Sequence, residues 1–279
     1  MSASHFVLAG ILGWPVSHSR SPVIHNHWIA QHRLQGAYVQ MAVQPAQLEA
    51  ALRGLPALGF AGCNVTMPHK VAAMALMDEL DPVARRIGAI NTIVMQPDGR
   101  LKGFNNDGAG YIQSLRDADP GWRADAGPAL LLGAGGAARA IGVALLDQGV
   151  PELRLANRTQ ARAEALAAEF GDRAKVVPWS QRNEAMAGLS LLVNATTQGM
   201  HGQPPLDVAL DDLPAQALVS DAIYIPLETP LLAQARLRGH RTVNGLGMLL
   251  NQARPAFQAW FGVLPELTPE LRAAVQATF

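Results

Sequence analysis

The sequence of 279 residues has little cysteine, little charge and no long apolar run. Its single cysteine, Cys63, cannot form an internal disulfide, so we expect a protein of a reducing compartment, the cytoplasm. The 22 basic and 22 acidic side chains balance, so the chain lacks the basic excess with which proteins bind nucleic acids. No apolar run approaches the about 18 residues of a membrane span, and Met1–His5 lacks the basic start of a secretory signal. We therefore expect no nucleic-acid partner and no membrane partner.

Hydrophobic side chains make up 49% of the residues, in short runs that alternate with helical patterns, as in βα units. A polar, turn-rich stretch at 117–128 separates two such series and predicts an α/β protein of two domains. In the first series, Ser21 before Pro22 is the expected N-cap of a helix reaching about Gln35. The predicted strands of this series are 6–11, 38–43 and 61–65, followed by a hairpin of 90–95 with 100–105. The second series predicts strands at 129–132, 153–156, 175–177, 191–194 and 218–223, and helices at 161–170, 246–260 and 269–278.

A glycine-rich turn follows the apolar strand 129–132 directly and opens a helix. Its G-x-G-x-x-A spacing places Gly133 at the tight turn, Gly135 where a pyrophosphate approaches the backbone, and Ala138 where helix and strand pack closely. Free N–H groups at the helix start then face the phosphates. The alternative is a βα turn without a ligand, but the strand–turn–helix context favours a dinucleotide site. The residues predicted to form it are Gly133, Ala134, Gly135, Gly136 and Ala137.

The end of the next strand indicates which dinucleotide binds. An NAD site usually carries an acidic residue about 20 residues after the glycine turn, where it accepts from a ribose hydroxyl. Here the strand is followed by Asn157, Arg158 and Thr159, with Arg162 one turn later. Guanidinium groups suit a 2′-phosphate, so this pattern favours NADP. In the alternative interpretation, Arg162 pairs with a glutamate such as Glu169 on a solvated helix.

Side chains with chemical capacity follow several predicted strands of the first series, where open α/β sheets bind ligands. They offer neutral donors and acceptors with one cation and one anion, which suits a small polyhydroxylated carboxylate better than a metal or a nucleic acid. The histidines His18, His25 and His69 lack metal-ligand spacing, so we expect no metal site. The chemically capable side chains are Ser19, Ser21, Thr66, Lys70, Asn91 and Asp107.

These segments together resemble the shikimate dehydrogenase family over essentially the whole chain. The motifs, in order, are S-x-S-P, N-V-T-x-P-x-K, G-A-x-N-T, N-x-D-G, G-A-G-G-A-A-R, N-R-T-x-x-R, N-A-T-x-x-G-M and N-G-L-G-M-L-x-x-Q. The resemblance implies an N-terminal open α/β substrate domain, a C-terminal Rossmann-type NADP-binding domain and a cleft between them. It also implies the NADPH-dependent reduction of 3-dehydroshikimate to shikimate, in chorismate and aromatic amino-acid biosynthesis.

The resemblance assigns roles residue by residue. It makes Lys70 and Asp107 the catalytic pair of a proton relay that also contacts substrate. Gln252 in the substrate site implies a discontinuous first domain, 1–107 completed by the helices in 245–279, around an NADP-binding domain at 108–244. Asn106 departs from the family, which commonly has threonine there. The further substrate contacts implied are Ser19, Ser21, Thr66, Asn91, Tyr224 and Gln252, and the residues beside the nicotinamide are Thr196, Gly245 and Met248.

Two alternatives remain open at this point. One is a quinate/shikimate dehydrogenase paralogue, a group that often accepts NAD. The other is a ligand sensor without catalysis, which the presence of both Lys70 and Asp107 disfavours. The expected assembly is a monomer or a homodimer.

Overall fold

The computed structural model describes residues 6–279. Met1–His5, predicted to lack the start of a secretory signal, lies outside the described residues. The chain divides into two compact units. The first holds the chain up to Asn106 together with Gln252–Phe279, and the second is Asp107–Asn251. The sequence predicts the second boundary between the two units earlier, at residue 245. The structure places it inside helix α8 (Leu246–Phe261), where an uninterrupted helix carries no turn signal to mark a boundary.

The first unit contains a six-stranded mixed sheet of order β2-β1-β3-β5-β6-β4. Strand β1 is parallel to β2 and β3, β5 is antiparallel to β3 and β6, and β4 is parallel to β6. The strands are β1 (Val7–Gly13), β2 (Gly36–Ala42), β3 (Phe60–Val65), β4 (Glu79–Leu80), β5 (Thr92–Met95) and β6 (Leu101–Phe104). The helices are α1 (Ser21–Gln31), α2 (Leu48–Gly54), α3 (Pro82–Ile87) and α9 (Pro269–Gln276), with short 3₁₀ turns at Pro45–Gln47 and Ala72–Leu76.

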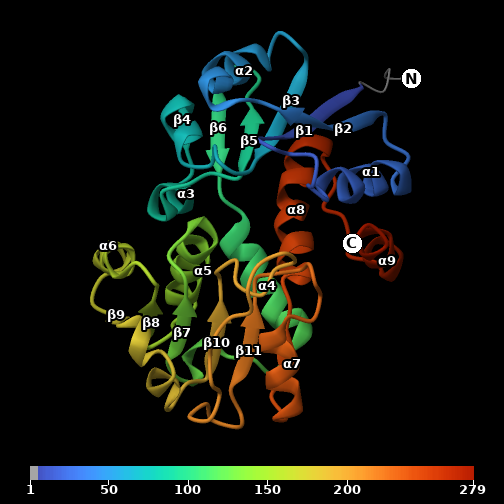
Figure 1. The fold of residues 1–279 in the computed structure, drawn as a ribbon. Coiled ribbons are helices and arrows are strands. Elements are labelled where there is room, and N and C mark those ends of the chain that lie inside the picture. Colours follow the sequence, from blue (N-terminus) through green and yellow to red (C-terminus); the bar gives the residue numbers. More distant parts are fainter. Residues whose placement is uncertain (1–5) are drawn as a thin grey trace. The chain divides into compact units, whose positions relative to one another are not determined.

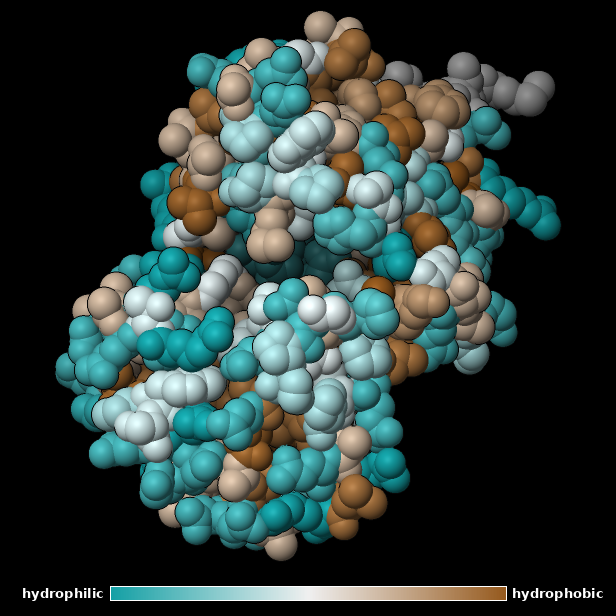
Figure 2. All heavy atoms as spheres, in the orientation of Figure 1, coloured by the Kyte–Doolittle hydropathy of each residue, from teal (hydrophilic) through white to brown (hydrophobic). Residues whose placement is uncertain are grey.

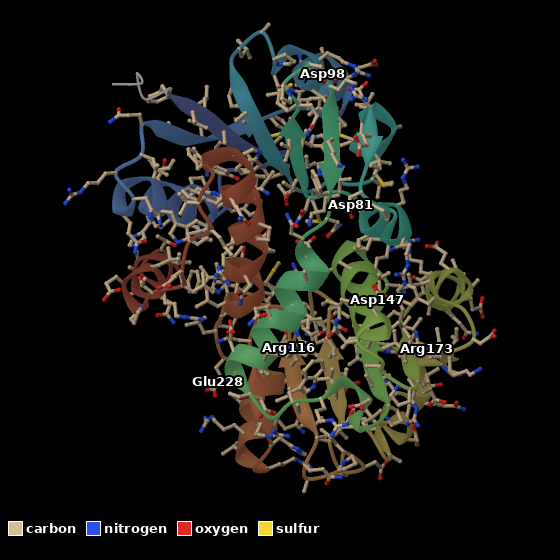
Figure 3. The ribbon with its side chains drawn as sticks, turned by 180° about the vertical axis from the view of Figure 1, so that it is seen from behind. Asp81, Asp98, Arg116, Asp147, Arg173 and Glu228 are labelled. Carbon is tan, nitrogen blue, oxygen red and sulfur yellow. The ribbon has the colours of Figure 1, made fainter. Side chains whose placement is uncertain are left out.

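The hairpin predicted from the sequence is present as β5 and β6. Its turn is stabilised by Asp98, labelled in Figure 3, whose Oδ1 accepts from the Arg100 N–H at 3.1 Å. Gly99 in this turn has φ +83°, which glycine adopts without strain. Because β5 runs antiparallel to β3, the start of β5 lies beside the end of β3.

Helix α1 differs from its prediction at both ends. The cap position is Arg20, without a side-chain cap, and Ser21 is the first helical residue, so its prediction as N-cap is wrong. The hydroxyl of Ser19 instead accepts from the Ser21 N–H at 3.3 Å. The helix ends at Gln31 rather than near Gln35, because Arg33 takes a left-handed φ of 52° that cannot continue a helix.

Two cores cover the faces of this sheet. One face packs aliphatic residues, among them Leu12, Leu52 and Ile93, under α2. Aromatic rings from α1 and α8 gather in another cluster, in which Trp28 and Phe257 pack edge to face at 5.3 Å. The indole of Trp260 donates to the Ile93 carbonyl at 3.0 Å, so α8 is attached to the sheet itself.

The second unit contains a six-stranded, fully parallel sheet of order β12-β11-β10-β7-β8-β9. This is the predicted Rossmann-type topology (Figure 1). The strands are β7 (Ala129–Leu132), β8 (Leu153–Ala156), β9 (Ala174–Val177), β10 (Leu191–Asn194), β11 (Leu218–Asp221) and β12 (Thr242–Val243). The helices are α4 (Asp107–Ala118), α5 (Gly136–Asp147), α6 (Gln160–Phe170) and α7 (Pro230–Leu237), with 3₁₀ turns at Ala124–Ala126, Trp179–Gln181 and Glu184–Met186.

The side chains of alternate residues in β7 point to opposite faces of this sheet, as the period of two in a strand requires. Ala129 and Leu131 join the core under α4, α5 and α6, whereas Leu130 and Leu132 join the core under α7. Both faces are therefore covered, which is why β7 reads as a continuous apolar run. Helix α7 and the two-residue strand β12 were not predicted.

Hydrophilic side chains cover most of the visible surface of each unit, with apolar residues in small groups between them (Figure 2). The large hydrophobic side chains on the surface, such as Leu58 and Leu237, belong to separate elements or loops. Across residues 6–279, no helix is both long and apolar enough to cross a membrane.

Candidate functional site

The glycine turn of the second unit lies between β7 and α5 and leaves space above its backbone. Gly133 has φ +113°, and a Cβ there would lie 2.9 Å from the Ala195 carbonyl oxygen, so a larger residue would clash. Around Gly135 and Gly136 a Cβ would meet no atom within 4 Å. Ala138 is fully buried, as close packing of helix and strand requires. The turn thus combines a tight bend with an open backbone at the start of α5, which fits a pyrophosphate.

The strand order reverses between β7 and β10, since β8 and β9 extend the sheet on one side and β11 and β12 on the other. Ligands of open parallel sheets bind at such a reversal, beyond the carboxyl ends of the strands. The structure brings two predicted site residues together there. A Cβ built on Gly133 would lie 3.3 Å from Cγ2 of Thr196.

The side chains that follow β8 are donors. The Asn157 amide donates to the Thr159 carbonyl at 2.8 Å, which shapes the loop into α6. Arg158 and Arg162 are exposed, and within residues 6–279 neither guanidinium has a hydrogen bond or an ion pair. Glu169 pairs instead with Arg139, so the alternative pairing of Glu169 with Arg162 is wrong. Two available guanidiniums fit the 2′-phosphate of NADP.

A buried network shapes the loop that follows β10. Oδ1 of Asn194 accepts from the backbone N–H and the hydroxyl of Thr196, at 3.0 and 2.8 Å. The Asn194 amide group donates to both carboxylate oxygens of Asp221 at 3.1 Å. Burial raises the pKa of Asp221, although hydrogen bonds from Thr229, Ile223 and Asn194 act in the opposite direction. Thr196 is therefore held in place by groups that sequence reasoning did not assign.

Three further predicted residues lie beyond β11 and β12. Gly245 donates its N–H to the Ile223 carbonyl at 2.8 Å, and a Cβ there would lie 2.1 Å from the Ala222 carbonyl oxygen. This close backbone approach admits only glycine. Met248 packs against the same apolar core as Ala134. Tyr224 is half-buried in the loop after β11.

In the first unit, the predicted site residues gather at one edge of the mixed sheet. Ser19 and Ser21 follow β1, Thr66 follows β3, and Asn91 precedes β5. Backbone bonds connect these segments, from the Thr66 N–H to Leu12 at 2.9 Å and from the Val65 N–H to Asn91 at 2.9 Å. The ends of β1 and β3 and the start of β5 therefore share one edge.

Lys70 and Gln252 belong to the same edge. The Lys70 carbonyl accepts from the Ile90 N–H at 2.9 Å, directly before Asn91, and Lys70 is half-buried. The Asn91 amide donates to Oε1 of Gln252 at 3.2 Å, which links α8 to the sheet edge. Asp107 is the buried first residue of α4 and belongs with Tyr224 to the second unit.

Sequence reasoning missed part of the polar network beneath this edge. The Tyr38 hydroxyl donates to Oδ1 of Asn64 at 2.6 Å, and the Asn64 amide donates to the Thr92 hydroxyl at 3.1 Å. Burial raises the pKa of Tyr38 well above its usual value. The available signal was an asparagine within the apolar strand β3, because a buried amide needs partners.

The histidines His25 and His69 and the cysteine Cys63 are packed or hydrogen-bonded within the fold, and among the residues that the structure describes they are not arranged as metal ligands. Within residues 6–279, no three His, Cys, Asp or Glu side chains cluster as a metal site would require. His25 stacks on Tyr38 at 4.1 Å, and burial lowers its pKa to about 3. Nε2 of His69 contacts the Val43 carbonyl at 2.8 Å. Burial raises the pKa of the Cys63 thiol to about 12, so it is not a reactive thiolate.

Two family descriptions match the chain. The shikimate dehydrogenase substrate binding domain matches residues 11–93, and shikimate / quinate 5-dehydrogenase matches residues 123–201. The shikimate dehydrogenase (NADP(+)) of Paramagnetospirillum magneticum is 55% identical over 268 residues, which cover 96% of this chain and 97% of that protein.

Solved structures of other proteins align with nearly the whole of this chain. Shikimate 5-dehydrogenase from Thermus thermophilus, in complex with NADP(H) and shikimate, aligns with a TM-score of 0.86 and 38% identity, covering 98% of this chain and 100% of that one. Quinate dehydrogenase from Corynebacterium glutamicum, in complex with NAD, aligns with a TM-score of 0.90 and 29% identity, covering 97% and 99%. The resemblance predicted from the motifs is confirmed, and the chain belongs to the shikimate dehydrogenase family.

Proposed function

We propose that the chain is an NADP-dependent shikimate dehydrogenase of the cytoplasm, which reversibly reduces 3-dehydroshikimate to shikimate for chorismate and aromatic amino-acid biosynthesis. The observation that carries the proposal is the sheet edge of the first unit, where Thr66, Lys70, Asn91 and Gln252 gather. These side chains offer one ammonium among neutral donors and acceptors, which is the chemistry that recognises a hydroxylated ring with a ketone.

The substrate side of the proposed site consists of hydroxyl and amide groups that orient the ring. In the reducing direction, the Lys70 ammonium gives its proton to the oxygen of the substrate ketone as that oxygen gains charge. Asp107 completes the pair by accepting from a ring hydroxyl and balancing the ammonium. In the oxidising direction, Lys70 takes the proton back from the hydroxyl. The groups that orient the ring are Ser19, Ser21, Thr66, Asn91, Tyr224 and Gln252.

The cofactor side of the proposed site is the glycine turn with the two arginines that follow β8. The backbone of residues 133–137 holds the pyrophosphate, and Asn157, Arg158, Thr159 and Arg162 hold the 2′-phosphate of the adenosine half. Thr196, Gly245 and Met248 line the nicotinamide half. When bound, NADPH supplies the hydride for the ketone carbon.

One assay tests this function against both alternatives. Purified protein is given shikimate or quinate with NADP or NAD, and reduced cofactor is followed by its absorbance. We expect the highest kcat/KM for shikimate with NADP. A higher kcat/KM for quinate or for NAD would favour the quinate/shikimate paralogue, and no turnover with any pair would favour the sensor.

A further inference from the structure

The hydroxyl of Thr92, at the start of β5, has its full hydrogen-bonding capacity in use. Its oxygen accepts from the amide groups of Asn64 and Asn106, at 3.1 and 3.0 Å. Its single proton goes to Oδ1 of Asn91 at 2.8 Å. A hydroxyl has one proton and two lone pairs, so with both lone pairs occupied Thr92 acts toward Asn91 as a donor.

A second donor fixes the same amide. Oδ1 of Asn91 also accepts from the backbone N–H of Asn106 at 3.0 Å, and a backbone N–H can only donate. The Asn91 side chain is therefore held with its oxygen toward Thr92 and Asn106. Its Nδ2 donates to Oε1 of Gln252 at 3.2 Å, so the oxygen end of Gln252 is directed at Asn91. The Nε2 end of Gln252 is then the donor end of this amide.

The network is buried, which makes the orientation costly to reverse. Asn64 is 4% exposed, Asn91 3% and Thr92 1%. Turning the Asn91 amide over would place its N–H₂ group against two donors and leave buried groups without acceptors. At the far end, Asn64 is fixed in the same way, because its Nδ2 donates to the Asn91 carbonyl at 3.0 Å and a carbonyl can only accept; the Tyr38 hydroxyl then donates to Oδ1 at 2.6 Å.

We propose that Thr92, with Asn106, is a positioning residue that sets the amide orientation of Asn91 and, through it, of Gln252. Both amides then present N–H donors to the ligand. The proposal rests on the proposed function and deepens it, because two fixed donors select neighbouring hydroxyl or carbonyl oxygens, which only need to accept. Neither Thr92 nor the Asn106 side chain has to touch the substrate.

The first test replaces Thr92 with valine, which keeps its shape and removes the hydroxyl. We expect Thr92→Val to raise the KM for shikimate about 10-fold, which is the effect of losing one neutral buried hydrogen bond. The change in kcat should be smaller. The KM for NADP stays unchanged. Thr92→Ser keeps the hydroxyl and restores the KM to within about twofold of wild type. Thr268→Val is the matched control, because the Thr268 hydroxyl caps α9 in the same unit by accepting from the Leu271 N–H.

The second test is a double-mutant cycle that a merely structural role would not pass. In an Asn91→Ala background the target of the Thr92 hydroxyl is gone, so adding Thr92→Val should leave kcat/KM for shikimate unchanged. An equal loss in both backgrounds overturns the proposal, as does a Thr92→Val enzyme with the wild-type KM. If Thr92→Val does not fold, Asn106→Asp replaces the test, since its carboxylate draws the Thr92 proton away from Asn91 and should raise the same KM.

Failure of the proposed function is visible separately. A wild-type protein without turnover on shikimate and NADP refutes the function before any variant is compared. An active wild type with additive variants refutes the positioning role alone.

Discussion

Arg139 of α5 donates from both Nη atoms to the carboxylate of Glu169 at the end of α6, with Nη2 to Oε1 at 2.6 Å. The guanidinium lowers the pKa of Glu169, although burial acts in the opposite direction. The other carboxylate of α6, Glu164, accepts from Gln160 at 2.8 Å. Both acidic residues of this helix are therefore engaged elsewhere, and the Arg162 guanidinium remains available for an anion.

Arg162 and Arg158 should therefore determine the preference for NADP. Replacing either with alanine is expected to raise the KM for NADP about 10- to 100-fold, the effect of losing a charge-assisted hydrogen bond. The kcat/KM with NAD should change little, because NAD has no 2′-phosphate. Steady-state kinetics with both cofactors measure this. Arg123→Ala is the control, since Arg123 pairs with the exposed Asp125 before β7. Equal losses with NADP and NAD would contradict the assignment.

Lys70 should be needed for turnover more than for binding. Lys70→Met keeps the length of the side chain and removes the ammonium, so the proton has no carrier. We expect kcat with shikimate to fall about 100-fold or more, while KM changes much less. Lys102→Met is the matched control, because Lys102 lies in the same unit and pairs with Glu79. A Lys70→Met enzyme with wild-type kcat would refute the proton relay.

The parts of the fold that were predicted correctly depend on local signals. The strand Ala129–Leu132 is apolar at every residue. In the turn after it, only glycine fits at Gly133, because a side chain there would clash with the Ala195 carbonyl. A two-residue strand such as β12 has no such pattern, because its place is set by pairing with β11. Short strands therefore escape prediction even where their neighbours do not.

The parts of the site that were missed depend on contacts between distant segments. Tyr38, Asn64 and Thr92 meet only because β1 lies between β2 and β3 and because β5 runs against β3. The pairing of Glu169 with Arg139 rather than Arg162 likewise requires α5 beside α6. Ser21 shows the reverse error, since its sequence context is that of a cap but the helix starts one residue earlier.

Asp221 should make the second unit less stable as pH rises through its titration. Because burial raises its pKa, the unfolded chain loses this proton at a lower pH than the folded protein does. Its contribution to the free energy of unfolding is complete below the ordinary pKa of about 3.9 and is lost as pH rises through the raised value. Asp221→Asn cannot ionise. We expect the unfolding free energy of wild type minus that of the variant to fall as pH rises above the ordinary pKa, and to level off once pH exceeds the raised pKa of the folded protein.

Urea unfolding at a series of pH values measures that difference. Asp125→Asn is the control with the opposite sign, because the Arg123 guanidinium lowers the pKa of Asp125. A difference between wild type and Asp221→Asn that rises with pH would contradict the role of burial.

His25 should make the first unit less stable as pH falls. Burial lowers its pKa from 6.5 to about 3, so the folded protein keeps a neutral ring while the unfolded chain binds a proton. The contribution is complete above the unfolded pKa and is lost toward acid, at up to about 1.4 kcal/mol per pH unit. His25→Phe retains a ring to stack on Tyr38 and has no titration. The unfolding free energy of wild type minus that of this variant should therefore decrease from about pH 6.5 downward and stay level above about pH 7.5. Unfolding can be followed by tryptophan fluorescence, to which Trp28 and Trp260, whose rings lie 5.6 Å from that of His25, contribute with the other three tryptophans. A difference that stays constant from about pH 7 to pH 4 would show that the imidazole is protonated in the folded protein as readily as in the unfolded chain.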